Sequence, residues 1–383
     1  RQVPGLKIVL DNEWIAMTGG QPSPSSPCNL AGQPNAFRLD EALKSQGAHV
    51  ITADAYDKAE IEARVEEGLK LAAEGLFAIL IIRGTCIRKV PASAYGQKLA
   101  VDKELCRKCG RCHICPGIEA SEDGTPSWNN LCSGCVSRTP ACLQMCPFKA
   151  LSVAGSNTET ALETVTLPHA PEVIDVPPAD SFRRPPRLSL AIRGVGGQGN
   201  LFFGKVLAQV AFLAGYDNIL KGETHGMAQM GGPVISTFGC GEVFSPALVP
   251  GTANVLIAME KAEVLRPGFL DLLEPGGTVL MADTRILPHG LKPEAYPSDE
   301  AIAAQLEGYR VVSVDVLSIA LNLGDPKGRC ANVAMLGVLS TLPPFDVVPE
   351  AVWLQALRGI SRKPALWDLN HAAFMAGRGM QKG

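Results

Sequence analysis

The sequence predicts an α/β protein with two α/β layers and a cysteine-rich segment between them. Short apolar runs alternate with helical segments over residues 6–88, and a second such pattern, opened by a glycine-rich turn, begins at Leu188. Eight of the 12 cysteines lie between Cys106 and Cys146. With 383 residues, of which 46% are apolar and 19% charged, the chain is long enough for two or three domains with their own cores.

Charge and hydropathy argue against two classes of protein. The 35 Lys and Arg and 38 Asp and Glu give a formal charge of −3 without a block of like charge, which disfavours nucleic-acid binding. The longest apolar strand-like run, 76–82, is far shorter than the ~20 residues that cross a bilayer, so we expect no membrane span. Because the sequence leads from Arg1 almost directly into a strand pattern, we expect a fragment or one piece of a split protein.

The first α/β layer is predicted from three strands and one helix. Apolar runs over 7–10, 50–52 and 76–82 indicate strands, and a helical pattern covers 57–74. Three strands make a thin sheet, so we expect this layer to be incomplete. The cysteine-rich part that follows has few long periodic runs and must be held by a metal.

A proline-rich stretch separates this part from the second layer. Because proline interrupts helices, we interpret residues 156–187 as a linker. Its prolines are Pro168, Pro171, Pro177, Pro178, Pro185 and Pro186. The second layer is predicted to be doubly wound, with a helix over 201–214 and strands over 188–192, 255–258, 278–282 and 311–314. The expected domains are therefore 1–98, 99–155 and 188–383, with the linker before the last.

The distribution of the cysteines favours metal binding over disulfides. Clustering at two-residue gaps is typical of thiolate ligands for a soft metal in a reducing compartment, which makes the cytoplasm the expected location. Four cysteines stand alone and are expected to be structural; among them Cys86, which follows a strand, is also a candidate neighbour of a cofactor. They are Cys28, Cys86, Cys240 and Cys330.

The clustered cysteines form the bacterial ferredoxin motif twice, each time with altered spacing. In the motif Cys-x2-Cys-x2-Cys-x3-Cys-Pro, three close thiolates bind one [4Fe-4S] cube and the fourth binds the other cube of a pair. Here the first copy is one residue short before its last cysteine, and the second has four extra residues in its middle. The copies are Cys106, Cys109, Cys112 and Cys115 with Pro116, and Cys132, Cys135, Cys142 and Cys146 with Pro147.

We expect the two copies to exchange their last ligand. Crossed ligation gives one cluster to Cys106, Cys109, Cys112 and Cys146, and the other to Cys132, Cys135, Cys142 and Cys115. Two structural zinc sites are the alternative, although zinc commonly joins two cysteine pairs across a longer loop. His113 is a candidate minor ligand or a surface neighbour. Positive charge from Arg107, Lys108 and Arg111 is expected to favour the reduced form of the first cluster, or serves only solubility.

A glycine-rich turn opens the second layer. The sequence Gly194-Val-Gly-Gly-Gln-Gly199 follows a strand and precedes a helix, which is the Gly-x-Gly-x-x-Gly form of a dinucleotide turn. Glu223 would be the acidic residue that a nicotinamide site needs. The polar, glycine-dense loop over 223–232 argues against a simple dinucleotide fold and favours a docking or substrate-facing loop. Nucleotide or coenzyme binding and a tight turn needed only for packing both stay open.

The first strand ends in a polar segment that can bind a hard cation. Asn12 offers an amide oxygen at the strand end, and the turn after it can offer a main-chain carbonyl, which suits Mg²⁺ holding a diphosphate. An ordinary polar turn is the alternative.

Taken together, these segments resemble the 2-oxoacid:ferredoxin oxidoreductases, most closely the indolepyruvate (arylpyruvate) type, over essentially the whole chain. Residues 10–21 resemble the second half of that family's thiamine-diphosphate motif, and residues 106–146 its two-cluster ferredoxin module. The glycine turn, the loop from Glu223 and residues 370–377 resemble its separate small gamma-type subunit, here fused after the ferredoxin module. The implied fold is a partial thiamine-diphosphate-binding α/β domain, a bacterial-type 2[4Fe-4S] ferredoxin module and a doubly wound α/β domain.

The resemblance also implies which residues hold cofactors. Asn12 would bind Mg²⁺ through its side chain and Trp14 through its carbonyl, with Met17, Thr18 and Gly19 near the thiamine diphosphate. In the second layer the expected contacts are Gly194, Gly196, Gly197, Gln198, Gly199, Glu223 and His225. No catalytic residue is assigned.

The sequence departs from the family in ways that imply a partner. The first thiamine half-motif, a Gly-Asp pair upstream of Asn12, is absent, as are the pyrimidine-binding domain and its activating glutamate. A partner chain or an upstream segment is therefore expected to complete the thiamine site, and we expect an oligomer. Met230 stands where the family usually has arginine, so the substrate and the acceptor are open.

The implied reaction is oxidative decarboxylation of a 2-oxo acid, with the acyl group passed to coenzyme A and electrons passed through two [4Fe-4S] clusters to a ferredoxin. An iron–sulfur electron-relay subunit with an NAD- or flavin-binding domain is the alternative function. A zinc-stabilised interaction protein without a redox role is the third.

Overall fold

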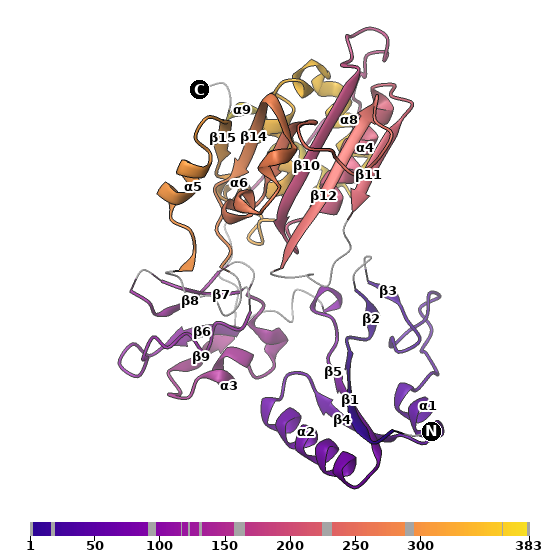
Figure 1. Ribbon diagram of the computed structural model, residues 1–383, viewed down its shortest axis with the longest axis vertical. Helices are drawn as coiled ribbons and strands as arrows, with labels where there is room; N and C mark the ends of the chain where they lie inside the picture. Colours follow the sequence, from indigo (N-terminus) through magenta and orange to yellow (C-terminus); the bar gives the residue numbers. More distant parts are fainter. Residues whose placement is uncertain are drawn as a thin grey trace. The chain divides into compact units, whose positions relative to one another are not determined.

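The computed structural model divides the chain into two compact units, Arg1–Thr160 and Ala161–Gly383 (Figure 1). In the part of the chain that the structure describes, no helix is long and apolar enough to cross a membrane. The division into segments 1–98, 99–155, 156–187 and 188–383 stays a prediction. The described residues are 3–16, 20–90, 97–115, 117–121, 123–129, 132–156, 165–223, 232–287, 295–361 and 363–380.

The first unit contains a parallel three-stranded sheet of order β1-β5-β4, whose strands contain or overlap the three predicted ones. Its predicted helix is α2, which begins after Asp57 because the Asp57 carboxylate accepts a hydrogen bond from the N–H of Glu60. Apolar side chains of α2 cover Ile51 and Leu80 of the sheet. The elements are β1 (Gly5–Asp11), β2 (Trp14–Ile15), β3 (Gln21–Pro22), α1 (Leu39–Ser45), β4 (His49–Asp54), α2 (Lys58–Ala73), β5 (Phe77–Arg83) and η1 (Ile87–Lys89).

The cysteine-rich part of the same unit consists of short elements around a small core. Two antiparallel pairs, β6 with β9 and β7 with β8, frame the cysteine loops. The buried side chains of Cys112, Ile118, Cys142 and Leu151 form the core. The elements are β6 (Gln97–Val101), β7 (Ile118–Ala120), β8 (Pro126–Trp128), η3 (Gly134–Ser137), α3 (Ala141–Met145) and β9 (Leu151–Ser156).

The second unit is built on a six-stranded sheet of order β11-β12-β10-β13-β14-β15. Strands β10, β13, β14 and β15 run parallel, and they include the four predicted strands. Strand β12 was not predicted; it runs antiparallel to β10 and to β11, so the sheet is mixed. The strands are β10 (Arg187–Val195), β11 (Ile219–Glu223), β12 (Pro233–Gly241), β13 (Ala253–Ala258), β14 (Leu273–Ala282) and β15 (Arg310–Val314).

Helices cover both faces of this sheet (Figure 1). Alternate residues of each strand point to opposite faces, so Leu190 and Val255 join one core and Ala191 and Leu256 the other. The larger core packs against α4, α7, α8 and α9, and the smaller one against η4, η5 and α5. The helices are α4 (Asn200–Leu213), η4 (Lys261–Leu265), η5 (Leu270–Leu272), α5 (Asp299–Gln305), α6 (Val316–Asn322), α7 (Ala331–Leu339), η7 (Phe345–Val347), α8 (Glu350–Ile360) and α9 (Pro364–Gly379).

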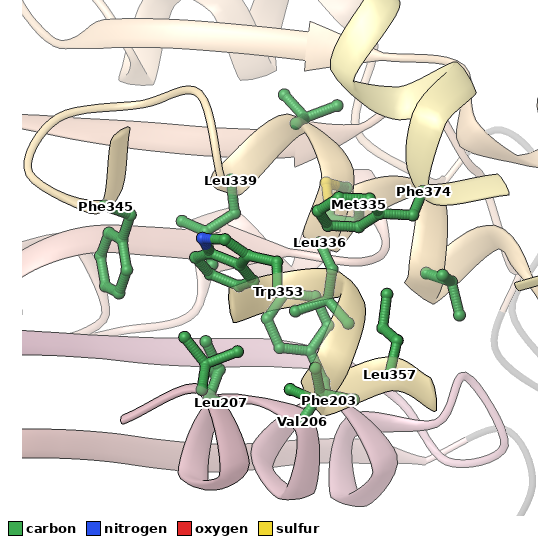
Figure 2. Packing of buried hydrophobic residues seen from close by; sticks show 14 of the residues in the cluster. Phe203, Val206, Leu207, Met335, Leu336, Leu339, Phe345, Trp353, Leu357 and Phe374 are labelled. Carbon is green, nitrogen blue, oxygen red and sulfur yellow. The ribbon is translucent and has the colours of Figure 1, made fainter. Parts of the chain in front are cut away.

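Trp353 of α8 lies at the centre of the larger core (Figure 2). Its ring stacks on Phe374 at 6.3 Å between centroids and meets Phe345 at 6.5 Å. Phe203 of α4 is also fully buried in this core. Full burial of one such side chain contributes about 1.5–3 kcal/mol, so this core holds α4 firmly and fixes the turn before it.

The described part of the predicted linker packs along the second unit. Residues 165–186 form neither helix nor strand. Ala170 is buried in the larger core, its N–H donates to the Asp368 carboxylate at 2.8 Å, and Trp367 Nε1 donates to the carbonyl of Pro171 at 3.1 Å. These contacts fasten the stretch to α9.

Candidate functional site

Four of the clustered cysteines surround one pocket of the first unit. Cys106, Cys109, Cys112 and Cys146 line it together with Arg107, Lys108 and Arg111. The pKa of the Cys112 thiol is raised to about 11, chiefly by burial, and the thiolates of Cys146, Cys109 and Cys106 contribute to that rise. We call these four cysteines the first thiol set.

The other four cysteines are electrostatic neighbours of one another. The pKa of the Cys142 thiol is raised to about 12, chiefly by burial, and the thiolates of Cys135, Cys115 and Cys132 contribute to that rise. Burial also raises the pKa of Cys115, to which Cys132 and Cys135 contribute. We call Cys115, Cys132, Cys135 and Cys142 the second thiol set. The electrostatic neighbours of Cys112 and of Cys142 are thus the other members of the two predicted groups, and the ligation itself stays a prediction.

The backbone around both sets is arranged to donate to sulfur. Main-chain N–H groups point at one thiol each: Lys108 at Cys106 and Ala150 at Cys146 in the first set, and Gly134 at Cys132 and Ala141 at Cys135 in the second, at 3.4–3.5 Å. Such donors stabilise a thiolate and tune the potential of a cluster.

Left-handed backbone conformations create these donor loops. Lys108, Cys135 and Val136 have φ values of 51°, 50° and 57°, which are costly for residues with a side chain, and most of all for a β-branched one. Strain of this kind persists where surrounding structure or function requires it.

Among the described residues, which include all eight cysteines, no group of three or more His, Cys, Asp or Glu side chains is placed to hold a metal ion. Zinc and iron–sulfur clusters both take thiolate ligands, and a cube bears one thiolate on each of its four irons. The donor chemistry of the sets fits an iron–sulfur cube.

The polar segment after β1 lies at the carboxyl edge of the parallel sheet. The Asn12 side-chain oxygen accepts from the N–H of Trp14 at 3.1 Å, and the carbonyl of Asn12 accepts from the N–H of Cys86 after β5 at 3.0 Å. Trp14 lies opposite Pro22, which has no N–H and so cannot donate a hydrogen bond to the Trp14 carbonyl. The turn thus holds two oxygens of the kind that Mg²⁺ prefers.

Buried charge fixes this turn. Asp11 is buried, and its carboxylate accepts from Arg83 Nε at 3.0 Å and from the N–H of Glu13 at 3.0 Å. The Lys89 ammonium lies 4.4 Å from the centre of the Trp14 ring. Met17, Thr18 and Gly19 lie outside the described residues.

The glycine turn of the second unit is closed by Gln198. Its Oε1 accepts from the N–H of Val195 at 2.7 Å and its Nε2 donates to the carbonyl of Met259 at 2.6 Å. The amide of Gln198, which the family resemblance assigns to cofactor binding, is therefore engaged in joining the ends of β10 and β13. A Cβ at Gly194 would lie 2.7 Å from Gln198 Oε1, so only glycine fits there.

Unsatisfied amides surround the start of α4. Gly199 caps the helix in a left-handed conformation with φ of 84°. Both amide atoms of Asn200 and the Oδ1 of Asn332 are buried without a hydrogen-bond partner among the described residues. Buried polar groups without partners are rare and call for a bound molecule or another explanation. A helix N-terminus with free donors is suited to an anion, so the turn fits a phosphate group.

The remaining predicted contacts of this turn are only partly described. Gly196 donates its N–H to the carbonyl of Gly232 at 2.8 Å, and Gly197 has a φ of 108°. Glu223 ends β11 and pairs with Lys221 at 2.8 Å. His225, and Met230 with it, lies outside the described residues.

Sequence reasoning missed a polar cluster between the α/β layer and the cysteine loops. Arg138 pairs with the Asp54 carboxylate at the end of β4, and Gln144 Nε2 donates to the carbonyl of Tyr56 at 2.7 Å. We call Asp54, Tyr56, Arg138 and Gln144 the junction cluster. Its partners are more than eighty residues apart in the sequence, so no local pattern could have revealed it.

Comparison with known proteins gives a match to one family and to two kinds of subunit. The profile of the family described as pyruvate ferredoxin/flavodoxin oxidoreductase matches residues 189–380. Indolepyruvate oxidoreductase subunit IorB of Archaeoglobus fulgidus is 35% identical over 157 residues, which are 40% of this chain and 76% of that subunit. The IorB subunit of Thermococcus kodakarensis is 33% identical over 195 residues, 49% of this chain and 93% of the subunit.

A second kind of subunit also matches. Indolepyruvate oxidoreductase subunit IorA of Methanothermobacter thermautotrophicus is 31% identical over 153 residues, which are 39% of this chain and 24% of that subunit.

Proposed function

Since this chain belongs to the pyruvate ferredoxin/flavodoxin oxidoreductase family and is an oxidoreductase that acts on 2-oxo acids with a ferredoxin, we propose that its substrate is indolepyruvate or another arylpyruvate. The names of the IorB and IorA relatives support that choice. The products would be the acyl-coenzyme A and CO₂, with the electrons delivered to ferredoxin.

The grouping of the eight thiols carries the proposal. Two electrons leave the 2-oxo acid, and ferredoxin takes them singly, so a chain of one-electron sites is needed between the two. The first thiol set and the second thiol set would each supply four ligands, and backbone N–H groups point at sulfur in both. We assign one [4Fe-4S] cluster to each set.

The carboxyl edge of the first sheet is the proposed thiamine site. Asn12 would hold Mg²⁺ through its side-chain oxygen and Trp14 through its carbonyl, and the Asp11–Arg83 pair keeps that turn in place. Bound thiamine diphosphate supplies an electron sink for decarboxylation. Met17, Thr18 and Gly19 would lie beside it. The match to 24% of an IorA subunit supports a partner chain or a further segment that completes the site.

The glycine turn is the proposed site for the phosphates of coenzyme A. Gly194, Gly196, Gly197 and Gly199 permit close approach of the backbone to a phosphate, and the start of α4 offers free N–H groups. The amide of Asn200, which has no hydrogen-bond partner among the described residues, supplies donors at the same place. Gln198 would act by shaping the turn, while Glu223 and His225 would face the bound molecule.

The test is anaerobic purification of the chain with whatever copurifies, followed by reduction of a viologen dye on addition of indolepyruvate, phenylpyruvate or pyruvate. Dye reduction by an arylpyruvate that depends on thiamine diphosphate and coenzyme A supports the proposal. Replacement Asn12→Leu should abolish it, whereas Asn29→Leu, on an exposed turn of the same unit, should not. An assembly that keeps both clusters and its partner but reduces no dye would contradict the proposal and favour an electron-relay role.

A further inference from the structure

We propose that the second thiol set is the one held against the Asn12 edge of the sheet, and that the junction cluster is a group of positioning residues that fastens it there. Electrons from a 2-oxo acid would then enter the second thiol set before the first. This inference rests on the proposed thiamine site and adds the order of the two electron-transfer sites to it.

Hydrogen bonds tie the second thiol set to the α/β layer. Gln144, which stands two residues after Cys142 of the second thiol set and two before Cys146 of the first, accepts the N–H of Lys58 at 2.8 Å and donates to the carbonyl of Tyr56 at 2.7 Å. Arg138, three residues after Cys135, pairs with Asp54, and its guanidinium lies 5.9 Å from the centre of the Tyr56 ring. The loop that carries Cys135 is thus bound to the end of β4, and this contact is the one that distinguishes the second thiol set, since Gln144 lies between ligands of both sets.

Tyr56 connects this attachment to the Asn12 edge. A Cβ at Gly84 would lie 3.2 Å from Cε2 of the Tyr56 ring, so the ring packs against the chain that leaves β5. Gly84 donates its N–H to the carbonyl of Asp11 at 3.0 Å, and Cys86 donates its N–H to the carbonyl of Asn12 at 3.0 Å. The Tyr56 ring therefore lies between Arg138, which follows a ligand of the second thiol set, and the segment that is hydrogen-bonded to the Asn12 turn.

The first thiol set has different surroundings. The pocket that Cys106, Cys109, Cys112 and Cys146 share is lined only by described residues from Cys106 to Leu151, and by no residue of the α/β layer. Its charged lining residues are basic: Arg107, Lys108 and Arg111. The first thiol set is therefore the one farther from the Asn12 edge along this chain of contacts.

The test is a redox titration of the intact chain, with its copurifying partners, followed by electron paramagnetic resonance. The signals are first assigned with Cys106→Ala and Cys132→Ala, each of which should remove one signal. Asp54→Asn removes a negative charge beside the second thiol set and should raise the potential of the Cys132-dependent signal alone, because adding an electron there becomes easier. Arg138→Gln removes the opposite charge and should lower the same potential.

The matched control is Glu67→Gln. Glu67 forms an exposed ion pair with Arg64 on α2 at 2.6 Å, so this variant changes the net charge by the same amount away from the junction cluster. It should move neither signal. If the two substitutions only loosened the structure, they would shift the potential of the Cys132-dependent signal in the same direction. If the second thiol set lies beside the Asp54–Arg138 pair, the two substitutions shift it in opposite directions.

Several results would overturn the inference: no shift, equal shifts in both signals, a shift confined to the Cys106-dependent signal, or shifts of the same sign in the two variants. Loss of both signals in each cysteine variant would also overturn it, because two separate sites would not exist. The titration uses dithionite and needs no 2-oxo acid, so it is independent of the thiamine assignment. When indolepyruvate is added and the sample is frozen rapidly, the Cys132-dependent signal should appear first. If indolepyruvate produces no signal at all but the titrated potentials shift as expected, the proposed function alone is contradicted.

Discussion

Gln198 and Met259 join two strand ends of the second sheet: the Nε2 of Gln198 donates to the carbonyl of Met259 at 2.6 Å, and its Oε1 accepts from the N–H of Val195 at 2.7 Å. Strands β10 and β13 run parallel, and the chain leaves β10 toward one side of the sheet and β13 toward the other. Ligands of open α/β sheets bind in the crevice at such a point. One side chain thus closes the turn that we assign to coenzyme A.

Replacing Gln198 by Glu should destabilise the second unit. The carboxylate has no N–H for the Met259 carbonyl, which is left unpaired, so we expect a loss of about 1–3 kcal/mol in the free energy of unfolding. Urea denaturation followed by tryptophan fluorescence measures it. Gln305→Glu, at the exposed end of α5, should change the free energy by less than about 0.5 kcal/mol. Equal losses in both variants would contradict this role of Gln198.

Asn200 should matter for coenzyme binding more than for stability. Its buried amide has no partner among the described residues, so Asn200→Leu removes a desolvation cost and should leave the free energy of unfolding unchanged or raise it by about 1 kcal/mol. The KM for coenzyme A should rise by about tenfold, the equivalent of one or two lost hydrogen bonds.

The control for Asn200 is Asn218, whose Nδ2 donates to the carbonyl of Gly241 at 3.3 Å. Asn218→Leu should lower stability and leave the KM for coenzyme A as it was. A variant Asn200→Leu that unfolds more easily but binds coenzyme A normally would show that the amide has a structural partner.

Glu260 makes the second unit sensitive to pH. It is buried, and burial raises the pKa of its carboxyl group even though Tyr296 donates a hydrogen bond to it. A carboxyl whose pKa is higher in the folded state binds more protons there, so it stabilises the fold at low pH and that contribution is lost as the pH rises through the raised pKa.

Tyr296→Phe removes the donor and raises the pKa of Glu260 further. We expect a loss of about 1–3 kcal/mol in the free energy of unfolding at neutral pH, and a smaller loss at pH 5, where more of the carboxyl is protonated. Urea denaturation at several pH values measures the difference. A loss that is the same at every pH would mean that Glu260 does not titrate in this range.

Local sequence patterns sufficed for the parallel strands and for α2 and α4, because apolar spacing and a capping Asp57 act over a few residues. They did not suffice for β12. Strand β12 pairs antiparallel with both β10 and β11, and this pairing depends on the assembly of the whole sheet. The glycine-dense loop before β12 has no apolar pattern that predicts a strand.

The candidate site shows the same limit. The grouping of the cysteines into two ligand sets was predicted from their spacing, because in the ferredoxin motif the last cysteine of each copy binds the other cluster, and it stays a prediction. The Arg138–Asp54 pair and the bridge made by Gln198 join residues brought together by folding, and nothing in the neighbouring sequence indicates them. The unpartnered state of Asn200 likewise depends on what surrounds it in the core.

Gly199→Ala tests the cap of α4. Gly199 has a positive φ, and a Cβ there would collide with the amide of Asn332, so we expect a loss of about 1–3 kcal/mol from strain in addition to the clash. Gly308 has a similar φ of 86° but open space around it. Gly308→Ala should therefore lower the free energy of unfolding, measured by urea denaturation, by less than Gly199→Ala does. Equal losses in the two variants would mean that Asn332 does not lie against Gly199.

Iron and sulfide content in paired cysteine variants is the most direct test of the central claim, which is that two four-thiolate clusters share crossed ligands. A chain with two cubes holds about eight irons. Cys112→Ala with Cys146→Ala removes two ligands of one set and should leave about four irons. Cys112→Ala with Cys115→Ala, which are closer in sequence but belong to different sets, should leave almost none. The reverse outcome, with about four irons kept when Cys112 and Cys115 are replaced and none when Cys112 and Cys146 are, would contradict crossed ligation.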